Sequence, residues 1–364
     1  MPFDLLEDSH LPAVSRFNQR LAAGGSQERF GPGPSPFSNY SESGQSAMDV
    51  KKFILRDESG EMRAGYYLKS QPYQLGGDVV EIGNLQLPIA EGIVDRRYAA
   101  LGIAIVSDAL QRNPWLYSLG LGGTDQPYPR LLRALKWDCQ PVPFFFRIVK
   151  PFRFARRIKT LRERPLRRLL LDLAAFTGLG WAAVKARDLL TTRPAGDSPG
   201  CEDTWHFDSS VDQLWEKARR GYGFTAVRSA GILNFLYRAE TFHRLLLRRG
   251  SDLIGWAVCL DTSFEQHKQF GNLRVGTVVD CFAAPERELE VLTAATGFLT
   301  KGVSSWLCPI NLTANGPRPW IGWGTCGGPR IFSWRGPPNW GTDARRREWI
   351  LRIFTSTAET ATVP

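Results

Sequence analysis

The sequence predicts an α/β (α+β) protein of two domains, each with a mixed, mostly antiparallel sheet flanked by helices. A chain of 364 residues is too long for one ordinary hydrophobic core and fits two domains of roughly 150 residues each. Its apolar content of 43% and charged content of 23% are typical of a folded, soluble protein. A hairpin, a strand, a helix and a further strand follow one another twice along the chain, which predicts two copies of one unit.

The first half is predicted to begin with a strand at residues 2–6 and a helix at 10–22, where apolar side chains recur at helical spacing. Two β-rich segments then flank the turn sequence DESGEM, which predicts a hairpin. After the first helix, the predicted elements are a Gly-, Ser- and Pro-rich loop at 23–48, hairpin strands at 51–56 and 64–70, a strand at 78–93, a helix at 102–112, a buried strand at 115–121, a short helix at 127–136 and a last strand at 140–149.

The second half repeats this order after a Pro-, Gly- and Ser-rich stretch at 189–204, which predicts a domain boundary. We expect a helix at 209–220 with Ser209 or Ser210 as its N-cap. The elements that follow are hairpin strands at 242–248 and 253–260, a strand at 274–283, a helix at 286–299 and a strand at 303–309. These patterns divide the chain into a first domain at 1–150, a basic and apolar helical linker at 151–204, a second domain at 205–350 and a flexible tail at 351–364.

The positive charge is concentrated in one segment. Residues 147–168 contain ten Lys or Arg and one Glu, which accounts for +9 of the net charge of +10. The stretch that follows, 169–184, is apolar and aromatic with one charge, and is too short to span a bilayer. This pattern fits a solvated linker helix followed by a core helix, or a segment, 147–184, that docks on an anionic membrane surface, or an RNA-binding segment.

The remaining composition favours a reduced cytoplasmic protein without metal. The N-terminus is acidic and has no apolar run typical of a signal peptide, and no stretch of about 18 uncharged apolar residues occurs. The six cysteines form no CxxC pair, and with four histidines they show no zinc-ligand spacing. We therefore expect a cytoplasmic protein, peripheral at the inner membrane surface if the basic segment binds lipid.

The segment that carries chemistry is GIVDRRYAALGIAIVSDAL, residues 92–110. A predicted strand ends there, a turn with Gly102 follows, and a helix begins. Small residues at Ala99, Ala100 and Ala104 leave the backbone N–H groups of the helix start open to an anion such as a pyrophosphate. The Rossmann and Walker glycine patterns are both absent. A tight strand-to-helix connection with small residues for packing is the alternative.

The element order over 2–149 and this loop together resemble the GNAT family, the Gcn5-related N-acetyltransferases. The acyl-CoA loop of that family has the pattern [QR]xxGx[GA], in which Gly102 and Ala104 match and Ala99 departs from Gln or Arg. The resemblance implies acetyl-CoA or another acyl-CoA as co-substrate. The residues it assigns to the cofactor are Val94, Arg96, Arg97, Tyr98, Ala99, Ala100, Leu101, Gly102, Ile103, Ala104 and Asp125, where Arg96 and Arg97 supply the missing cation.

The resemblance also implies catalytic residues. A glutamate near the end of the central strand removes a proton from the acceptor amine in many members, and Glu91 lies there. An ordinary strand carboxylate is the alternative, and Asp95 is a weaker candidate. A tyrosine often donates the proton to the departing thiolate, but Leu132 occupies that position, so Tyr128 or Tyr117 would have to substitute. Lys136-Trp137 stands where the family has Gly-Phe. The backbone of the strand at 116–122 would stabilise the oxyanion.

The second copy departs from the family loop. Pro285 and Glu286 replace the glycine, and Glu288 and Glu290 add negative charge where a phosphate would bind. We expect a degenerate repeat that forms a wall of the acceptor cleft. Similar tandem proteins carry RxxxxLNWRY before the second hairpin, and the segment from Arg228 to Tyr237 resembles it loosely. Those two residues either bind the acceptor or pack in the core.

Three functions are therefore compatible with the sequence. The first is a tandem GNAT-type N-acyltransferase that moves an acyl group, with acetyl the first candidate, from CoA to an amine. Resemblance to tandem proteins of envelope-polysaccharide pathways implies an amino sugar, another small molecule or a lipid-linked glycan as acceptor. The second is an aminoacyl-tRNA-dependent transferase of the Fem type, in which 147–168 binds tRNA. The third is a binding protein that keeps the fold without catalysis.

Overall fold

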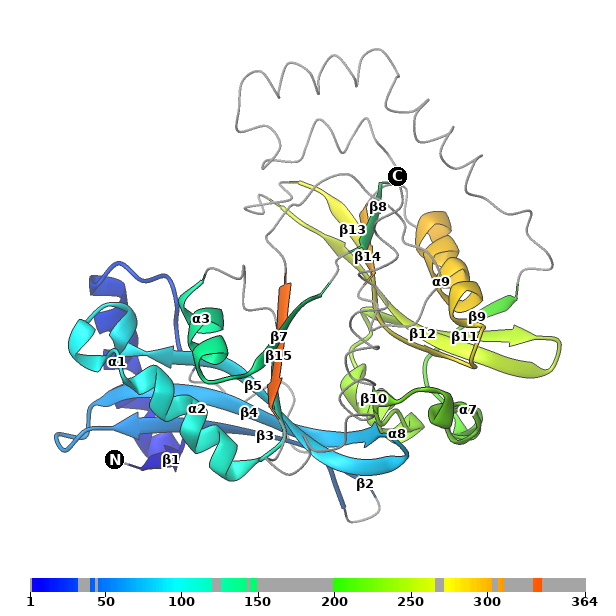
Figure 1. The fold of residues 1–364 in the computed structure, drawn as a ribbon. Helices are drawn as coiled ribbons and strands as arrows, with labels where there is room; N and C mark the ends of the chain where they lie inside the picture. Colours follow the sequence, from blue (N-terminus) through cyan, green and yellow to red (C-terminus); the bar gives the residue numbers. More distant parts are fainter. Residues whose placement is uncertain are drawn as a thin grey trace, which may run out of the picture. The chain divides into compact units, whose positions relative to one another are not determined.

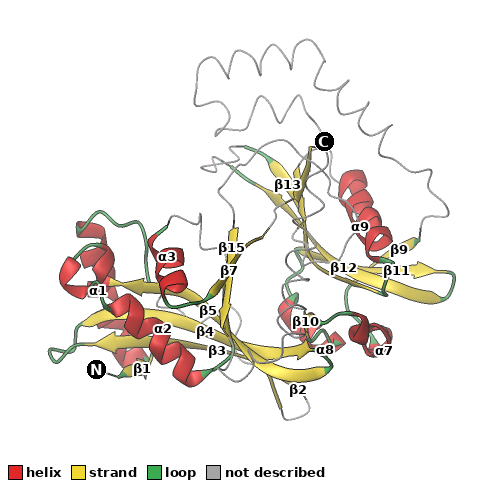
Figure 2. Ribbon diagram, in the orientation of Figure 1, coloured by secondary structure: helices red, strands yellow, loops and turns green. Residues whose placement is uncertain are grey.

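The computed structural model describes residues 2–31, 40–42, 45–119, 126–142, 145–148, 199–265, 272–302, 307–310 and 330–335. They form two compact units, and each is a mixed α/β structure with a sheet flanked by helices (Figure 1; Figure 2 shows the element types). The first unit contains the described residues up to Val142 and two strands from later in the chain, β10 (Phe224–Ala226) and β15 (Arg330–Arg335). The predicted α/β class is confirmed.

The sheet of the first unit has nine strands in the order β1-β3-β4-β5-β6-β15-β7, with β2 paired to β3 and β10 paired to β4. All neighbours are antiparallel except β5 and β6. The bounds of the strands from the first half are β1 Phe3–Leu5, β2 Tyr40–Glu42, β3 Gln45–Arg56, β4 Met62–Leu75, β5 Asp78–Ala90, β6 Leu116–Leu119 and β7 Asp138–Val142.

Helices cover both faces of this sheet. On β3, Phe53 and Leu55 belong to one core with residues of α2 (Leu101–Arg112) and α3 (Pro127–Ala134), while Ile54 between them packs against α1 (Leu11–Ala23). Side chains alternate between the two faces of a strand, so α1 lies on one face and α2 with α3 on the other. Short 3-10 helices at Asp8–His10, Glu91–Ile93 and Arg96–Tyr98 connect these elements.

The end of α3 explains the Lys136-Trp137 pair. The N–H of Trp137 donates to the carbonyl of Leu132 at 2.9 Å, and that of Lys136 donates to the carbonyl of Arg133 at 2.9 Å. These two bonds form a Schellman motif, which requires a left-handed residue at the position of Lys136. Its φ is +60°, and Trp137 and Leu132 are buried in the same core. Lys136 therefore has the backbone conformation for which glycine is favoured at a helix end.

The sheet separates between β5 and β6. The two strands pair through Gly83 with Leu116 and Asn84 with Tyr117, and no further residue pair joins them in the described part. Strand β15 pairs with β6 on its other side and with β7 beyond it. Strand β5 bulges just past the last pair, where Leu87 has a φ of +44°. Beyond residue 84 the edge of β5 that faces β6 is therefore free of ladder partners among the described strands.

The second unit has a six-stranded sheet in the order β8-β14-β13-β12-β11-β9. Residues Ala257 and Cys259 of β12 pack with α9, while Trp256 contacts Phe207 and Phe282 on the opposite face. The strands are β8 Phe145–Ile148, β9 Gly200–Thr204, β11 Phe242–Arg249, β12 Asp252–Ser263, β13 Arg274–Ala283 and β14 Leu307–Ile310. The helices are α7 Ser209–Ala218, a 3-10 turn at Arg219–Gly221, α8 Ala230–Leu236 and α9 Glu288–Gly302.

Several predicted elements differ in detail from the structure. The predicted strand at 140–149 is two strands: β7 belongs to the first sheet and β8 pairs with β14 in the second. Residues 200–204, expected in the linker, form β9 and pair with β11. The N-cap of α7 is Asp208, whose carboxylate accepts a hydrogen bond from the N–H of Ser210, not Ser209 or Ser210. The rest of the predicted linker, 151–198, and the tail lie outside the described residues. None of the helices described is both long and apolar enough to cross a membrane.

Candidate functional site

The start of α2 is open, as the sequence predicted. The N–H groups of Ile103 and Ala104 donate back to the carbonyl of Ala100 at 3.0 and 3.4 Å. Those of Leu101 and Gly102 have no acceptor among the described residues, and the N-cap, Ala100, offers no side chain. Ala99 and Ala100 are exposed. A helix start with free N–H groups and no covering side chain is suited to bind an anion.

Small residues let the preceding loop fold tightly. A Cβ atom on Gly92 would lie 2.6 Å from the carbonyl oxygen of Tyr98, so only glycine fits there. A Cβ on Gly24, at the end of α1, would lie 2.4 Å from the Cβ of Val94. A Cβ on Gly102 would meet the Leu131 side chain of α3 at 3.1 Å. Val94 is therefore a packing residue at the base of the loop, and Gly102 allows α3 to approach the helix start.

The two arginines expected to supply a cation differ in their contacts. Arg97 forms an ion pair with Asp95 at 2.6 Å, and the N–H of Arg97 also donates to that carboxylate at 3.0 Å. Arg96 is exposed. The hydrogen bonds from Arg97 lower the pKa of Asp95. Asp95 therefore caps the 3-10 turn at Arg96–Tyr98. Asp125, the remaining predicted cofactor residue, lies outside the described residues.

Glu91 is buried and both of its carboxylate oxygens are held by arginines. Oε1 accepts from Nε of Arg20 at 3.0 Å, and Oε2 accepts from Nη1 of Arg63 at 2.8 Å. Its side chain is 6% exposed. A general base must offer a free lone pair within reach of the acceptor amine. This geometry favours a structural role for Glu91 over the predicted role of base.

Tyr128 and Tyr117 lie on opposite faces of the sheet. Tyr128 on α3 packs against the core of α2, and its buried hydroxyl makes no hydrogen bond of normal geometry to a described residue. Burial raises the pKa of Tyr128, and the nearby Ser118 hydroxyl partly opposes that rise. Ser118 itself donates to the carbonyl of Leu85 at 2.7 Å, where β5 and β6 separate. Tyr117 instead shares a hydrogen bond of 2.8 Å with Tyr73.

In the second unit, the structure brings Arg228 and Tyr237 together on one carboxylate. Nε of Arg228 donates to Oδ2 of Asp280 at 2.7 Å, and the Tyr237 hydroxyl donates to the same oxygen at 2.8 Å. Burial, followed by the negative charge of Asp280, raises the pKa of Tyr237. Both residues therefore belong to a largely buried polar cluster.

The start of α9 carries negative charge. The helix begins at Glu288, two residues later than predicted, and Glu286 before it has a φ of +68°. Glu290 pairs with Arg287 at 2.5 Å and with Arg249 at 2.9 Å, and hydrogen bonds from these arginines lower its pKa. Glu288 accepts a hydrogen bond from the Tyr222 hydroxyl at 3.0 Å. The acidic first turn disfavours a phosphate at this helix.

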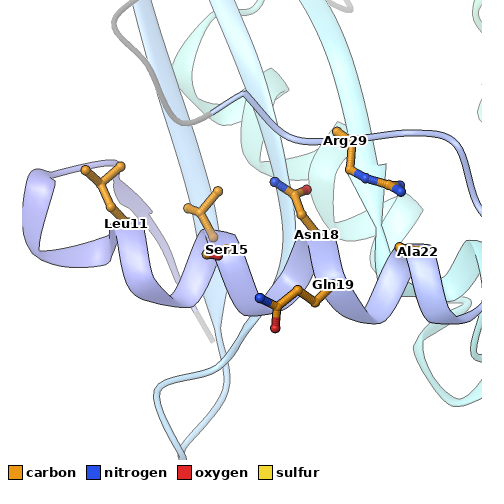
Figure 3. Close-up of a pocket in the computed structure, with 7 residues that line it drawn as sticks. Leu11, Ser15, Asn18, Gln19, Ala22 and Arg29 are labelled. Carbon is orange, nitrogen blue, oxygen red and sulfur yellow. The ribbon is translucent and has the colours of Figure 1, made fainter.

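A surface groove of about 490 Å³ runs along α1 (Figure 3). The side chains of Leu11, Ser15, Gln19 and Ala22 follow one side of the helix, and Arg29 from the segment after α1 reaches toward it. None of the candidate catalytic, cofactor-binding or acceptor-binding residues lines this groove. Within the described part of the chain, no three His, Cys, Asp or Glu side chains gather as metal ligands.

Sequence reasoning missed the partners of these groups. Arg63 and Arg20 contact Glu91 from 28 and 71 positions away. Ser118 lies near Tyr128, and Asp280 contacts Arg228 and Tyr237 from 52 and 43 positions away. These contacts join residues far apart in the chain, and the local sequence around a single arginine does not indicate which carboxylate it will pair with. Asp280 lies within β13, where its neighbours in the chain do not reveal these contacts.

No protein-family model matches the chain, and no curated protein matches it. Among solved structures, N-myristoyltransferase from Saccharomyces cerevisiae with bound myristoyl-CoA has a TM-score of 0.47 and 9% identity over 78% of this chain and 66% of that chain. The same enzyme with myristoyl-CoA and inhibitors has a TM-score of 0.47 and 8% identity over 92% and 79%. A conserved protein of unknown function from Enterococcus faecalis V583, a probable N-acyltransferase, has a TM-score of 0.45 and 9% identity over 91% of this chain and 71% of that chain. All three TM-scores lie below 0.5.

Proposed function

We propose that the first unit is an acyl-CoA site and that the protein is an N-acyltransferase of the GNAT type. The observation that carries the proposal is the separation of β5 from β6 after Asn84 and Tyr117, together with the open start of α2. The free edge of β5 offers backbone groups to an extended pantetheine arm, and the α2 N–H groups suit its pyrophosphate.

The chemistry follows from this placement. An uncharged amine attacks the thioester carbonyl, the C–N bond forms, and the carbonyl oxygen becomes an oxyanion that backbone N–H groups at the separated strands stabilise. The C–S bond then breaks, the thiolate of CoA takes a proton from a donor side chain, and the attacking nitrogen loses a proton to water, which leaves a neutral amide. Tyr128 is our candidate donor, because its hydroxyl has no hydrogen-bond partner of normal geometry among the described residues and lies near Ser118, where β5 and β6 separate.

The finer assignments also belong to this proposal. The acyl group is acetyl in the simplest case, and the acceptor is an amine of a small molecule, an amino sugar or a lipid-linked glycan. The second unit does not bind CoA, which the acidic start of α9 supports. A tRNA-dependent transferase with the same fold would ignore CoA, and an inactive relative would bind a ligand without turnover.

A thermal-shift series tests the proposal. Acetyl-CoA, longer acyl-CoAs and free CoA are added to the full chain, and ligand at 100 times its dissociation constant should add about 2.7 kcal/mol to the free energy of unfolding. Gly102→Asp places a carboxylate at the helix start and should abolish the shift. Gly102→Ala is the matched control, because its Cβ meets only the flexible Leu131 side chain at 3.1 Å. No shift with any acyl-CoA contradicts the proposal.

A further inference from the structure

Arg63 on β4 contacts the loop before α2 at both of its ends. Its Nη1 donates to Oε2 of Glu91 at 2.8 Å, where the loop begins. Its guanidinium carbon lies 4.8 Å from the ring centroid of Tyr98, where the loop approaches the helix. The side chain is 16% exposed, so solvent screens these contacts little.

A third contact fixes the guanidinium itself. Nε of Arg63 donates to Oδ2 of Asp57 at 2.7 Å, in the turn between β3 and β4. Hydrogen bonds stabilise that turn, since the Asp57 carboxylate also accepts from the N–H groups of Ser59 and Glu61 at 3.0 Å each. Burial disfavours the charge of Arg63, but its bonds to Glu91 and Asp57 outweigh this and raise its pKa. Arg63 therefore stays charged and oriented.

The other carboxylate oxygen of Glu91 is also held by an arginine. Arg20 of α1 bonds Oε1 of Glu91, and its Nη1 bonds Glu61 at 2.6 Å. Glu91 is thus fixed between a helix and a strand, and its backbone carbonyl accepts the N–H groups of Val94 and Asp95 at 3.0 and 2.9 Å. The arginines that hold the Glu91 carboxylate therefore also help to fix the backbone at the start of the loop.

We infer that Arg63 is a positioning residue that clamps residues 91–98, through Glu91 at one end and Tyr98 at the other, so that the N–H groups of the α2 start are held ready for the pyrophosphate of an acyl-CoA. The ligand in this inference rests on the proposed function, while the clamp rests on the contacts alone. The planar guanidinium group of an arginine can donate hydrogen bonds to a carboxylate while its face stacks on an aromatic ring. The ammonium group of a lysine does both less well.

The test compares backbone exchange and ligand affinity in matched variants of the full chain. Arg63→Gln removes both ends of the clamp, and Arg63→Lys keeps the charge but not the fork. Arg16→Gln is the control, because the ion pair of Arg16 with Glu61 at 2.6 Å lies in the same cluster without reaching the loop. Hydrogen–deuterium exchange is followed in peptides that cover 91–104, and the dissociation constant for acetyl-CoA is measured by calorimetry.

We expect Arg63→Gln to speed exchange in 91–104 several-fold and to raise the dissociation constant about tenfold, equivalent to about 1.4 kcal/mol. For Arg63→Lys, the exchange rate and the dissociation constant should both lie between those of Arg63→Gln and the wild type. Arg16→Gln should leave both quantities unchanged. Equal exchange in Arg63→Gln and the wild type overturns the clamp, whether or not CoA binds. If the wild type binds no acyl-CoA, the proposed function fails and exchange still decides the clamp.

A second variant covers the case in which Arg63→Gln does not fold. Tyr98→Leu removes only the ring, from a half-exposed position, and Tyr98→Phe keeps it. We expect faster exchange in 91–104 for the first and wild-type exchange for the second. Wild-type exchange in Tyr98→Leu overturns the role of the ring in the clamp.

Discussion

At the scale of single residues, Lys136 has a backbone conformation that its side chain does not favour. Its φ of +60° lies in the left-handed region, which costs an L-residue with a Cβ about 1 kcal/mol or more. Lys136→Gly should therefore raise the free energy of unfolding by about 1 kcal/mol, measured by urea denaturation. Lys136→Ala keeps the Cβ and controls for the lost charge. A gain in the alanine variant equal to that in the glycine variant would assign the effect to charge.

Tyr128 is the residue whose removal should affect the chemistry most directly. Tyr128→Phe keeps the ring in its core and removes the proton donor, so kcat should fall about 100-fold while KM changes less than about threefold. Tyr117→Phe is the matched control, since that hydroxyl pairs with Tyr73 on the other face. Steady-state kinetics with an acyl-CoA and an amine measure both. A kcat for Tyr128→Phe close to that of Tyr117→Phe contradicts the assignment.

Features that depend on neighbours in the chain could be predicted from the sequence, and features that depend on distant residues could not. Gly102 and the small residues around it lie at a helix start because a strand, a turn and a helix follow one another locally. Glu91 was expected on a strand but lies one residue past the end of β5, in a 3-10 turn. Its partners Arg20 and Arg63 lie 71 and 28 residues away. Long-range ion pairs of this kind leave no local pattern, so a base and a structural carboxylate look alike in sequence.

At the scale of elements, strand β15 completes the first sheet. It pairs with β6 from Leu116 to Leu119 and with β7 from Asp138 to Val142, and it joins β7 to the rest of the sheet. The sequence predicted nearly every strand and helix up to residue 142, because hydrophobic periodicity and turns act locally. It did not predict that β10 and β15, from late in the chain, pair with strands of the first half, because strand pairing across such distances leaves no periodic signal.

This exchange of strands predicts that residues 1–150 alone do not form a stable unit. The fragment lacks β10 and β15, so β6 loses one neighbour and β7 loses its connection to the sheet. We expect the isolated fragment to lack a cooperative thermal transition by circular dichroism. Co-expression with residues 328–352 supplies β15 but not β10, so it should restore the transition in part, and a scrambled peptide of the same composition is the control. A transition in the fragment like that of the full chain contradicts the prediction.

At the scale of the whole molecule, the uneven distribution of positive charge predicts where the protein binds. Residues 147–168 carry +9 and the rest of the chain carries +1, and an apolar, aromatic stretch follows at 169–184. We propose from the sequence that 147–184 docks on an anionic membrane surface. Each Lys or Arg near such a surface contributes about 1 kcal/mol, so roughly four or five contacts suffice for reversible binding.

The prediction is that the full chain co-sediments with anionic vesicles at low salt and is released as salt rises, since exposed charges are screened beyond about 10 Å at 0.1 M. Replacing Arg153, Arg156, Arg157 and Arg162 with Gln should abolish co-sedimentation without changing the affinity for acetyl-CoA. The control replaces four arginines of the second unit, Arg219, Arg220, Arg248 and Arg249, and should leave vesicle binding intact. If the wild type does not co-sediment at low salt, the membrane proposal is wrong.

Binding to tRNA under the same conditions, lost in the first variant and not in the control, would instead favour the tRNA-dependent transferase, because contacts to phosphates show the same steep dependence on salt.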